Sequence, residues 1–370
     1  MTKALIVAFR ADSSLDIGSG HVMRCLTLAD ELARQGAVCH FICREHPGNL
    51  IEFIRNKGHQ VCSLPLISET EVGEPTELLA HSAWLGSSQK TDAKACAEVL
   101  KEIKPDWLIV DHYALDIRWE KTLAPHYGKL MVIDDLADRE HCCGLLLDQT
   151  FGRDPSDYLQ WTPETCLRLC GVQYALLRPE FERWRERSLE RRKAGKLEHI
   201  LINLGGVDKG NITSQVLIAL KACEIPKKTC VTVVMGSTAP WVDDVSALAA
   251  EMPWPTVVKV GVSNMAELMA SSDLAIGAAG ATSWERCSLG LPSFLVVLAK
   301  NQGKVAKELE CAGAAICINS PSTIKAKLSA SVESLVSNPD ALRNMSMRAS
   351  AVTDGRGAAL VCKRMRCLSV

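Results

Sequence analysis

The chain has 370 residues, of which 47% are hydrophobic and 23% are charged, so its composition is that of a globular protein and not of a disordered one. At this length two or three domains are expected. The formal net charge is -1, from 42 basic and 43 acidic residues, which excludes a general attraction to nucleic acid or to an anionic membrane.

Targeting signals and cysteines point to the same compartment. The apolar run in residues 1–10 has no cleavage-site pattern and no stretch is long enough to span a bilayer, so we expect a cytoplasmic protein. The sixteen cysteines lie in apolar periodic segments, which favours buried reduced thiols. Cys39, His40, Cys43 and His46 crowd together, but His40 faces the opposite side of a strand from the two cysteines, so we expect no zinc site.

Short apolar runs alternate with helical patterns along the chain, which is typical of parallel α/β sheets. In the first half we predict strands at 4–9, 38–43, 107–111, 130–133 and 145–148, and helices at 22–35, 49–57, 91–103 and 117–124. In the second half we predict strands at 199–204, 230–235, 256–260, 273–276, 294–297 and 315–318, and helices at 212–222, 242–250, 265–270, 283–289 and 304–312. The fold class is therefore α/β, with two Rossmann-like domains that face each other across a cleft.

A highly charged segment separates the two halves. Residues 178–196 hold eight basic and four acidic side chains, which favours an exposed connector with a solvated helix face over a binding patch. We place the domain boundary here. The predicted division is an N-terminal domain of residues 1–190, a C-terminal domain of residues 197–340 and a helical tail of residues 341–370.

The first motif, RADSSLDIGSGHVMRC, occupies residues 10–25 and follows the first strand. Gly18 and Gly20 precede an amphipathic helix, so His21 is expected in the first helical turn. The free amides there favour a nearby anion and a neutral imidazole, and a neutral histidine can take a proton from water. A histidine that only caps the turn is the alternative. The candidate substrate-binding residues of this segment are Asp12, Gly20 and Arg24.

The second motif, NLGGVDKGN, starts at Asn203 and ends a strand in a glycine-rich turn before a helix. Gly205 and Gly206 allow backbone amides to approach a phosphate closely, and Gly206 is the candidate contact. Many strand-to-helix turns also carry two glycines for steric reasons alone. A purely steric role for Gly205 and Gly206 is therefore the alternative.

The third motif, GAAGATSWERCSLGLP, starts at Gly277, where a strand ends. Thr282 or Ser283 is expected to cap the following helix, which carries Glu285 in its first turn. Amides at such a helix start can hold a diphosphate, and a carboxylate can accept hydrogen bonds from ribose hydroxyls. The alternative for Glu285 is an acid that only complements the helix dipole. The candidate diphosphate contacts are Gly280, Ala281 and Thr282.

The segments IGSGHVMRCLTLA, NLGG, GAAGATSWERCSLGLPS and KNQ, in this order and spacing over about residues 4–304, resemble the UDP-2,4-diacetamido-2,4,6-trideoxy-β-L-altropyranose hydrolases of pseudaminic-acid biosynthesis. That family is related to two-domain GT-B glycosyltransferases, including the peptidoglycan transferase that makes lipid II. The resemblance implies a GT-B fold, UDP held mainly by the C-terminal domain, and hydrolysis in place of transfer.

The resemblance also implies residue roles. His21 corresponds to the family's catalytic histidine, the proposed base for water, and Tyr113 to a tyrosine near the sugar. Glu285 occupies the position that binds the ribose, and the backbone of Val262 the place that reads uracil. Asn301 corresponds to an asparagine important for activity and nucleotide contact, although an N-cap role is the alternative for it.

We therefore predict a hydrolase that cleaves the glycosidic C–O bond of this UDP-sugar by His21-activated attack of water on the anomeric carbon. Glycine-loop amides and helix dipoles can balance the diphosphate, so we expect neither metal nor cofactor. The predicted partner is the small-molecule UDP-sugar, with no nucleic acid, no membrane and no oligomeric partner assigned. The alternatives are a GT-B glycosyltransferase that uses a UDP-sugar donor and a non-catalytic nucleotide-sugar binding module.

Overall fold

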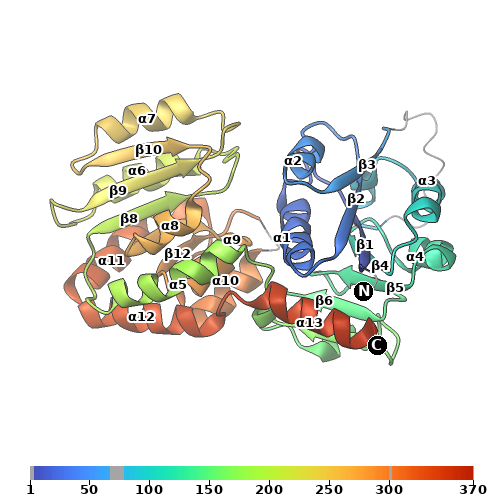
Figure 1. Cartoon of the computed structure of the whole chain (residues 1–370). Coiled ribbons are helices and arrows are strands. Elements are labelled where there is room, and N and C mark those ends of the chain that lie inside the picture. The colour runs from blue at the N-terminus through green and yellow to red at the C-terminus, as the bar shows by residue number, and fades with distance from the viewer. Residues whose placement is uncertain (1–3, 67–78, 300–301, 370) are drawn as a thin grey trace. The chain divides into compact units, whose positions relative to one another are not determined.

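The computed structural model describes residues 4–66, 79–299 and 302–369, and it divides the chain into two units (Figure 1). The first unit contains the chain up to Leu176 together with the segment from Gly357 onward, and the second unit is Leu177–Arg356. Each unit is built around one parallel sheet. The prediction of two Rossmann-like α/β domains is confirmed.

The sheet of the first unit has its strands in the order β3-β2-β1-β4-β5-β6-β7. The strands are β1 Ile6–Ala11, β2 Val38–Arg44, β3 Gln60–Leu64, β4 Trp107–Asp111, β5 Lys129–Ile133, β6 Leu145–Asp148 and β7 Leu167–Cys170. The order reverses at β1, because β2 and β3 lie on one side of it and β4 to β7 on the other. Open α/β sheets commonly bind ligands beyond the carboxyl ends of the strands at such a switch point.

Helices cover both faces of this sheet, which explains why its strands read as nearly continuous apolar runs (Figure 1). Alternate residues of β1 separate the two faces: Val7 and Phe9 belong to one buried cluster, and Ala8 belongs to the other. The helices are α1 Gly20–Arg34, α2 Ile51–Asn56, α3 Gln89–Ile103, α4 Ile117–Leu123 and α13 Gly357–Ser369, with short 3-10 helices η2 Ser82–Leu85, η3 Ala124–His126, η4 Pro155–Tyr158 and η5 Val172–Tyr174.

The sheet of the second unit has the order β10-β9-β8-β11-β12-β13 and reverses at β8 in the same way. Its strands are β8 His199–Asn203, β9 Cys230–Met235, β10 Thr256–Val260, β11 Leu274–Ala278, β12 Ser293–Val296 and β13 Ala315–Ile318. Its helices are α5 Pro179–Arg192, α6 Ile212–Lys221, α7 Val242–Ala250, α8 Met265–Ala270, α9 Thr282–Ser288, α10 Gln302–Cys311, η6 Pro321–Thr323, α11 Ile324–Ser337 and α12 Pro339–Val352.

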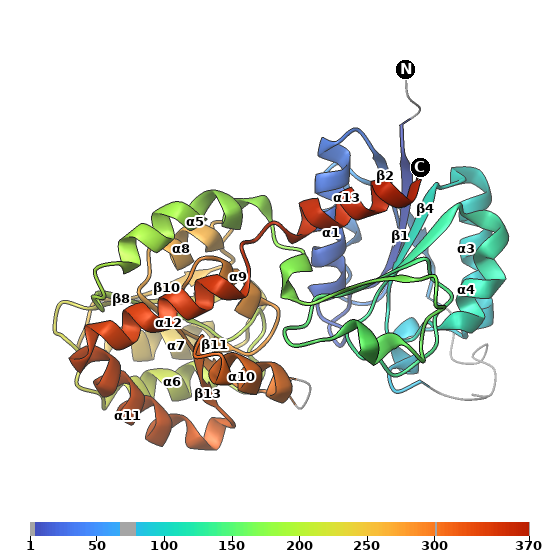
Figure 2. The same cartoon turned by 90° about the horizontal axis from the view of Figure 1, so that it is seen from below.

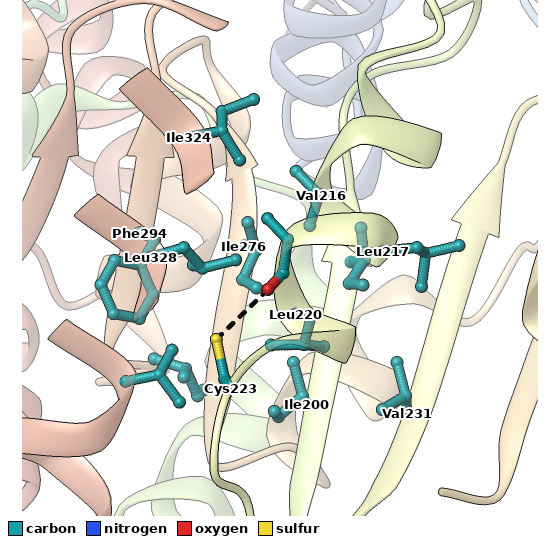
Figure 3. Packing of buried hydrophobic residues seen from close by; sticks show 14 of the residues in the cluster. Ile200, Val216, Leu217, Leu220, Cys223, Val231, Ile276, Phe294, Ile324 and Leu328 are labelled. Carbon is teal, nitrogen blue, oxygen red and sulfur yellow. Dashed lines mark hydrogen bonds between the residues drawn. The ribbon is translucent and has the colours of Figure 1, made fainter. Parts of the chain in front are cut away.

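Figure 3 shows the core on one face of the second sheet, where α6 packs between the strands and α11. Leu217 and Leu220 of α6 are fully buried, as is Leu328 of α11, and each such side chain contributes about 1.5–3 kcal/mol through its burial. Cys223 lies in the same core, with Sγ 3.4 Å from the carbonyl oxygen of Ala219. Burial raises the pKa of the Cys223 thiol, as expected for a reduced cysteine in a core.

All sixteen cysteines are free, and most of them are buried, as predicted. Cys311 and Cys367 are exceptions, because both are exposed. Both cysteines lie near the ends of helices, α10 and α13, on the side away from the core.

The predicted domain boundary is wrong. Residues 178–196 form no exposed connector, because α5 belongs to the second unit and packs on α8 and α9. Arg192 of α5 is buried and donates hydrogen bonds to the carbonyl oxygens of Met269 and Ser272 at 2.7 Å and of Leu289 at 3.1 Å. A guanidinium that satisfies carbonyls at helix carboxyl ends adds favourable charge there. Part of the charge run therefore holds helices together.

The predicted tail of residues 341–370 is helical, as expected, but it is not a separate part of the molecule. Residues 339–352 form α12, which packs on α9 and α5 in the second unit. The chain then returns to the first unit, where Val361, Cys362 and Met365 of α13 are fully buried in the same cluster as α1. Figure 2 shows α13 beside α1. The tail is divided between two cores because its apolar stripes cover a different unit in each helix.

Candidate active site

His21 lies in the first turn of α1, directly after the glycine turn that follows β1, as predicted. Its Nδ1 atom lies 2.6 Å from Oδ1 of Asp111, the last residue of β4. The carboxylate accepts the Nδ1 proton, and this tautomer leaves the lone pair of Nε2 unprotonated. Within the described ranges Nε2 has no hydrogen-bond partner. The arrangement is that of a proton acceptor held by a carboxylate.

Arg24, one turn further along α1, holds the Asp111 carboxylate by two hydrogen bonds. Nε donates to Oδ2 at 2.6 Å, and Nη2 donates to Oδ1 at 2.7 Å. Burial opposes the charged form of Asp111, but the charges of Arg24 and His21 outweigh it and lower its pKa. Asp111 therefore stays ionised, and it can stabilise the imidazolium that forms when His21 takes a proton. Arg24, predicted to bind substrate, is thus engaged in holding the base.

Asp135, which follows β5, joins Arg24 to Tyr113. Arg24 Nη1 donates to Oδ2 of Asp135 at 2.5 Å, and the Tyr113 hydroxyl donates to the same oxygen at 2.7 Å. Burial and the Asp135 charge raise the pKa of Tyr113, so its hydroxyl remains a donor. The rings of Tyr113 and His21 meet edge to face with centroids 4.6 Å apart. The structure therefore brings Tyr113 next to His21.

Asp12, predicted to bind substrate, is fully buried. Its Oδ1 accepts a hydrogen bond from the Arg44 amide at 2.7 Å and lies 2.6 Å from Nη1 of Arg10. Its Oδ2 lies 3.3 Å from Nε2 of His112. The prediction is wrong, because a side chain without exposed surface cannot contact a ligand. Asp12 instead ties together the ends of β1, β2 and β4.

The glycine turn before α1 is exposed. Gly18 has φ 78°, which a residue with a side chain adopts only with strain, and it pairs with Ser14 across the turn. Gly20, predicted to contact substrate, is the exposed first residue of α1, and a Cβ atom added there would meet no other atom. The open space at Gly20 leaves its backbone accessible to a ligand.

The two glycine motifs of the second unit lie side by side at its switch point. One follows β8 and the other lies at the end of β11, and these strands pair with Asn203 opposite Gly277. Gly206 is exposed and Gly280 is partly exposed. Gly277 must be glycine, because a Cβ there would lie 2.8 Å from the carbonyl oxygen of Asn203. The fold thus places both predicted phosphate-binding loops at the same edge of one sheet.

The predicted cap of α9 is wrong. The helix begins at Thr282 with Ala281 as its N-cap, and no side chain caps it. The hydroxyls of Thr282 and Ser283 instead accept hydrogen bonds from Arg286 at 3.3 and 3.1 Å. Burial lowers the pKa of Arg286 to about 10, and its guanidinium also donates to the carbonyl oxygen of Ala278. The two hydroxyls therefore accept hydrogen bonds from the buried Arg286 guanidinium and do not cap the start of the helix.

Glu285 lies in the first turn of α9, as predicted, with 17% of its side chain exposed. Oε1 lies 3.7 Å from Nη2 of Arg178, and burial raises the pKa of Glu285 while the Arg178 charge opposes that rise.

Val262 follows β10 at the same edge of the sheet, three strands from β11, which is about 14 Å at the usual strand spacing. Asn301 lies outside the residues that the structure describes.

Several residues around His21 were not predicted from the sequence. Asp111 directly follows a buried apolar run and Asp135 lies two residues after another, so their place at the carboxyl edge of the sheet was a usable signal. Trp84 of η2 lies with its ring centroid 6.1 Å from that of His21, and no motif pointed to it. Across the described part of the chain, no group of three or more His, Cys, Asp or Glu side chains is arranged to hold a metal ion.

Residues 206–359 match the model of the glycosyltransferase family 28 C-terminal domain. The chain is 29% identical over 235 residues to the UDP-2,4-diacetamido-2,4,6-trideoxy-beta-L-altropyranose hydrolase of Campylobacter jejuni, a match that covers 63% of this chain and 70% of that protein. The chain is a relative of this hydrolase family. The resemblance inferred from the motifs is therefore confirmed.

Two further comparisons bear on the extent of this relationship. The chain is 26% identical over 300 residues to an uncharacterised protein of Methanocaldococcus jannaschii, a match that covers 80% of this chain but only 56% of the archaeal protein. The crystal structure of MurG from Acinetobacter baumannii is 17% identical, with a TM-score of 0.69 over 98% of this chain and 99% of that one. The chain therefore has a fold of the GT-B type. Among the described helices, none combines the length and apolarity needed to cross a membrane.

Proposed function

We propose that the protein hydrolyses UDP-2,4-diacetamido-2,4,6-trideoxy-β-L-altropyranose, or a close isomer, to UDP and the free sugar. The observation that carries this proposal is the His21–Asp111 pair, in which an ionised carboxylate orients an imidazole whose Nε2 has no partner in the described ranges. The similarity of this chain to the Campylobacter hydrolase suggests the class of substrate.

In the proposed reaction a water molecule lies within hydrogen-bond reach of His21 Nε2. Its oxygen forms a bond to the anomeric carbon while its proton passes to Nε2, and the electron pair of the breaking C–O bond leaves with UDP. Asp111 stabilises the imidazolium as it forms, and Arg24 keeps that carboxylate in place. Displacement at carbon by water from the opposite side inverts the anomeric centre.

We assign nucleotide binding to the carboxyl edge of the second sheet. The loops after β8 and β11 offer backbone amides at Gly206 and Gly280 to the diphosphate, and these would stabilise the charge of the leaving UDP. Glu285 is proposed to accept hydrogen bonds from the ribose and the backbone of Val262 to bind the uracil. Asn301 stays a predicted contact of the same nucleotide.

A glycosyltransferase is the second candidate function, because the match of residues 206–359 is to a glycosyltransferase domain. The same donor site and the same base would then serve an acceptor hydroxyl in place of water. Incubation with the UDP-sugar alone separates the two reactions, since a transferase leaves the donor nearly intact without an acceptor. A binding module without activity would bind UDP and release nothing.

The deciding experiment is turnover of a panel of UDP-sugars, with products identified by mass spectrometry and NMR. In water enriched in ¹⁸O, we expect the label on the free sugar and unlabelled UDP. A sugar 1-phosphate among the products, or label in the UDP phosphate, would show attack at phosphorus and overturn the proposal. His21→Asn should lower turnover by about 10²–10⁴-fold and leave the affinity for UDP unchanged.

A further inference from the structure

Three aromatic rings gather beside His21 in the first unit. Trp84 and Tyr113 are nearly parallel, with an interplanar angle of 26° and centroids 5.9 Å apart. His81, which precedes η2, lies 4.4 Å from the Trp84 ring and 5.5 Å from the Tyr113 ring. These three residues are called the aromatic cluster below. Trp84 also contacts His21, at 6.1 Å and an angle of 75°.

The turn that carries Trp84 is held rigidly by its neighbours. Leu85 is buried, and Gly86 has φ 63°, with its Cα so close to His46 that an added Cβ would lie 2.8 Å from the imidazole. Arg44 at the end of β2 donates to the Ser87 hydroxyl at 3.2 Å. The packing of these neighbours, together with the ring contacts of Trp84 itself, therefore sets the position of Trp84 relative to the sheet.

Trp84 differs from Trp119, one of the tryptophans buried in the core of the same unit. Trp119 is 1% exposed, and its Nε1 donates to Asp92 at 2.9 Å. Trp84 is half-buried, and in the described part of the chain its Nε1 has no acceptor. A partly exposed indole with an unused N–H, on a turn that is packed against its neighbours, has the features of a binding surface.

The reacting atoms must pass close to this surface. A water activated by His21 has to lie about 3–3.5 Å from the anomeric carbon, so the ring that contains this carbon must lie near the histidine. Arg139 lies 5.8 Å from the centroid of Tyr113, and Asp135 accepts the bond from its hydroxyl, so polar groups border the aromatic cluster. Rings bordered by polar groups suit a sugar that has one face rich in C–H groups and hydroxyl or acetamido groups at its rim.

We infer that Trp84 adds a wall to the sugar subsite beside Tyr113 and His21, where its indole stacks on the apolar face of the pyranose. This inference rests on the proposed function. It identifies Trp84 as a residue that selects for sugars with an extended apolar face, such as deoxy and N-acetylated pyranoses. The subsite orients the anomeric carbon toward the water held by His21.

The test measures binding in the His21→Asn background, where the intact substrate survives the titration. Affinities for UDP-2,4-diacetamido-2,4,6-trideoxy-β-L-altropyranose and for UDP are compared by calorimetry, and their ratio is the contribution of the sugar. Trp84→Leu should reduce this ratio about tenfold and leave UDP affinity unchanged, whereas Trp84→Phe should retain most of it. Leu and Phe are both apolar, so their difference reports the aromatic face.

Trp184→Leu is the matched control, because Trp184 is another half-buried tryptophan that lies on α5 of the second unit. It should leave the ratio unchanged. An unchanged ratio in Trp84→Leu, or equal losses for UDP and UDP-sugar, would overturn the subsite. Circular dichroism establishes that each variant is folded, and Trp84→Phe remains informative if Trp84→Leu is not.

The two proposals fail in distinguishable ways. If the wild-type protein binds the UDP-sugar with a sugar contribution that depends on Trp84 but releases no UDP, the hydrolase proposal fails and the subsite stands. If the wild-type protein hydrolyses the UDP-sugar and Trp84→Leu changes neither KM nor the binding ratio, the subsite fails and the hydrolase stands.

Discussion

At the scale of single residues, the site depends on how one carboxylate is used. Asp111 accepts hydrogen bonds from both His21 and Arg24, and its lowered pKa keeps it charged. A charged carboxylate fixes the tautomer of the imidazole and stabilises its protonated form. The neighbouring His112 is buried and lies 3.3 Å from Asp12, so adjacent residues of the chain serve the active site and the core.

Asp111→Asn should lower kcat by about 10²–10⁴-fold with little change in UDP affinity. An amide of the same shape can donate a hydrogen bond to Nδ1, which selects the tautomer that is unable to accept a proton at Nε2. Steady-state kinetics across the pH range and calorimetry with UDP provide the measurement. A variant with more than about a tenth of the wild-type kcat would show that Asp111 does not support the base.

The acid stability of the first unit should depend on the same residue. The pKa of Asp111 is lower in the folded chain than its unfolded value of about 3.9, so its contribution to stability is complete above about pH 4 and is lost as the pH falls through the folded pKa. Urea unfolding between pH 5 and pH 2 should show a steeper loss of stability for the wild type than for Asp111→Asn. Parallel pH dependences would contradict this assignment.

Glu285→Ala should weaken UDP binding by about 1–3 kcal/mol, because hydrogen bonds from ribose hydroxyls to a charged group are lost. Calorimetry with UDP measures this loss. Glu267→Ala, which removes an exposed carboxylate from α8, is the control and should leave the affinity unchanged. Equal affinity in both variants would return Glu285 to the role of an acid that complements the start of α9.

At the scale of elements, α5 shows how a charged segment becomes part of a core. Its sequence PEFERWRERSLERR reads as a solvated surface, yet Arg185 and Arg192 donate hydrogen bonds to backbone carbonyls at the ends of other helices. Arg191 pairs with Asp273, the residue before β11. The helix thereby holds α8, α9 and α12 at the sheet that carries the two glycine loops.

Arg192→Gln should lower the free energy of unfolding of the second unit by about 3 kcal/mol, because several buried carbonyl groups lose a charged donor. Arg183→Gln on the same helix should cost less than about 0.5 kcal/mol, since Arg183 is exposed. Urea denaturation of both variants provides the comparison. Similar losses for the two would mean that the buried hydrogen bonds of Arg192 contribute little.

At the level of the whole molecule, each unit repeats one plan: a parallel sheet whose strand order reverses at its first strand, with the loops that carry the sequence motifs at the carboxyl edge of that switch point. The first unit places a histidine there and the second unit two glycine loops. The chain crosses between the units twice, after Leu176 and before Gly357, so the first core is completed only by the last helix.

Met365→Ala should destabilise the first unit by about 2–5 kcal/mol, because it removes a fully buried side chain from the cluster shared with α1. Leu360→Ala on the same helix is the control, since Leu360 is 39% exposed. Hydrogen exchange should show lost protection in α1 and β1 with little change in α6 and α11. Equal loss of protection in both units would contradict the assignment of α13 to the first core.

Elements with a strong local period, and turns that need glycine, could be predicted from the residues alone. β4, β6, β9 and β13 match their predicted bounds because each is a short, mostly buried apolar run, and the exposed edge strand β10 matches because it is rich in valine. The edge strands β3 and β7 were missed, because β3 contains the polar residues Gln60 and Ser63 and β7 contains the charged residue Arg168. His21 and both glycine loops were found because a strand end, a glycine turn and a helix start are neighbours in the chain.

The contacts between side chains of different strands could be seen only in the folded chain. Asp111 is 90 residues from His21, and Trp84 reaches it from a different loop, so no spacing in the sequence records these contacts. Arg192 and α13 were misassigned for the same reason, since a charge run or an amphipathic stripe does not identify the surface that will cover it. Local patterns arise from backbone geometry and burial, whereas a site depends on the order of strands in a sheet.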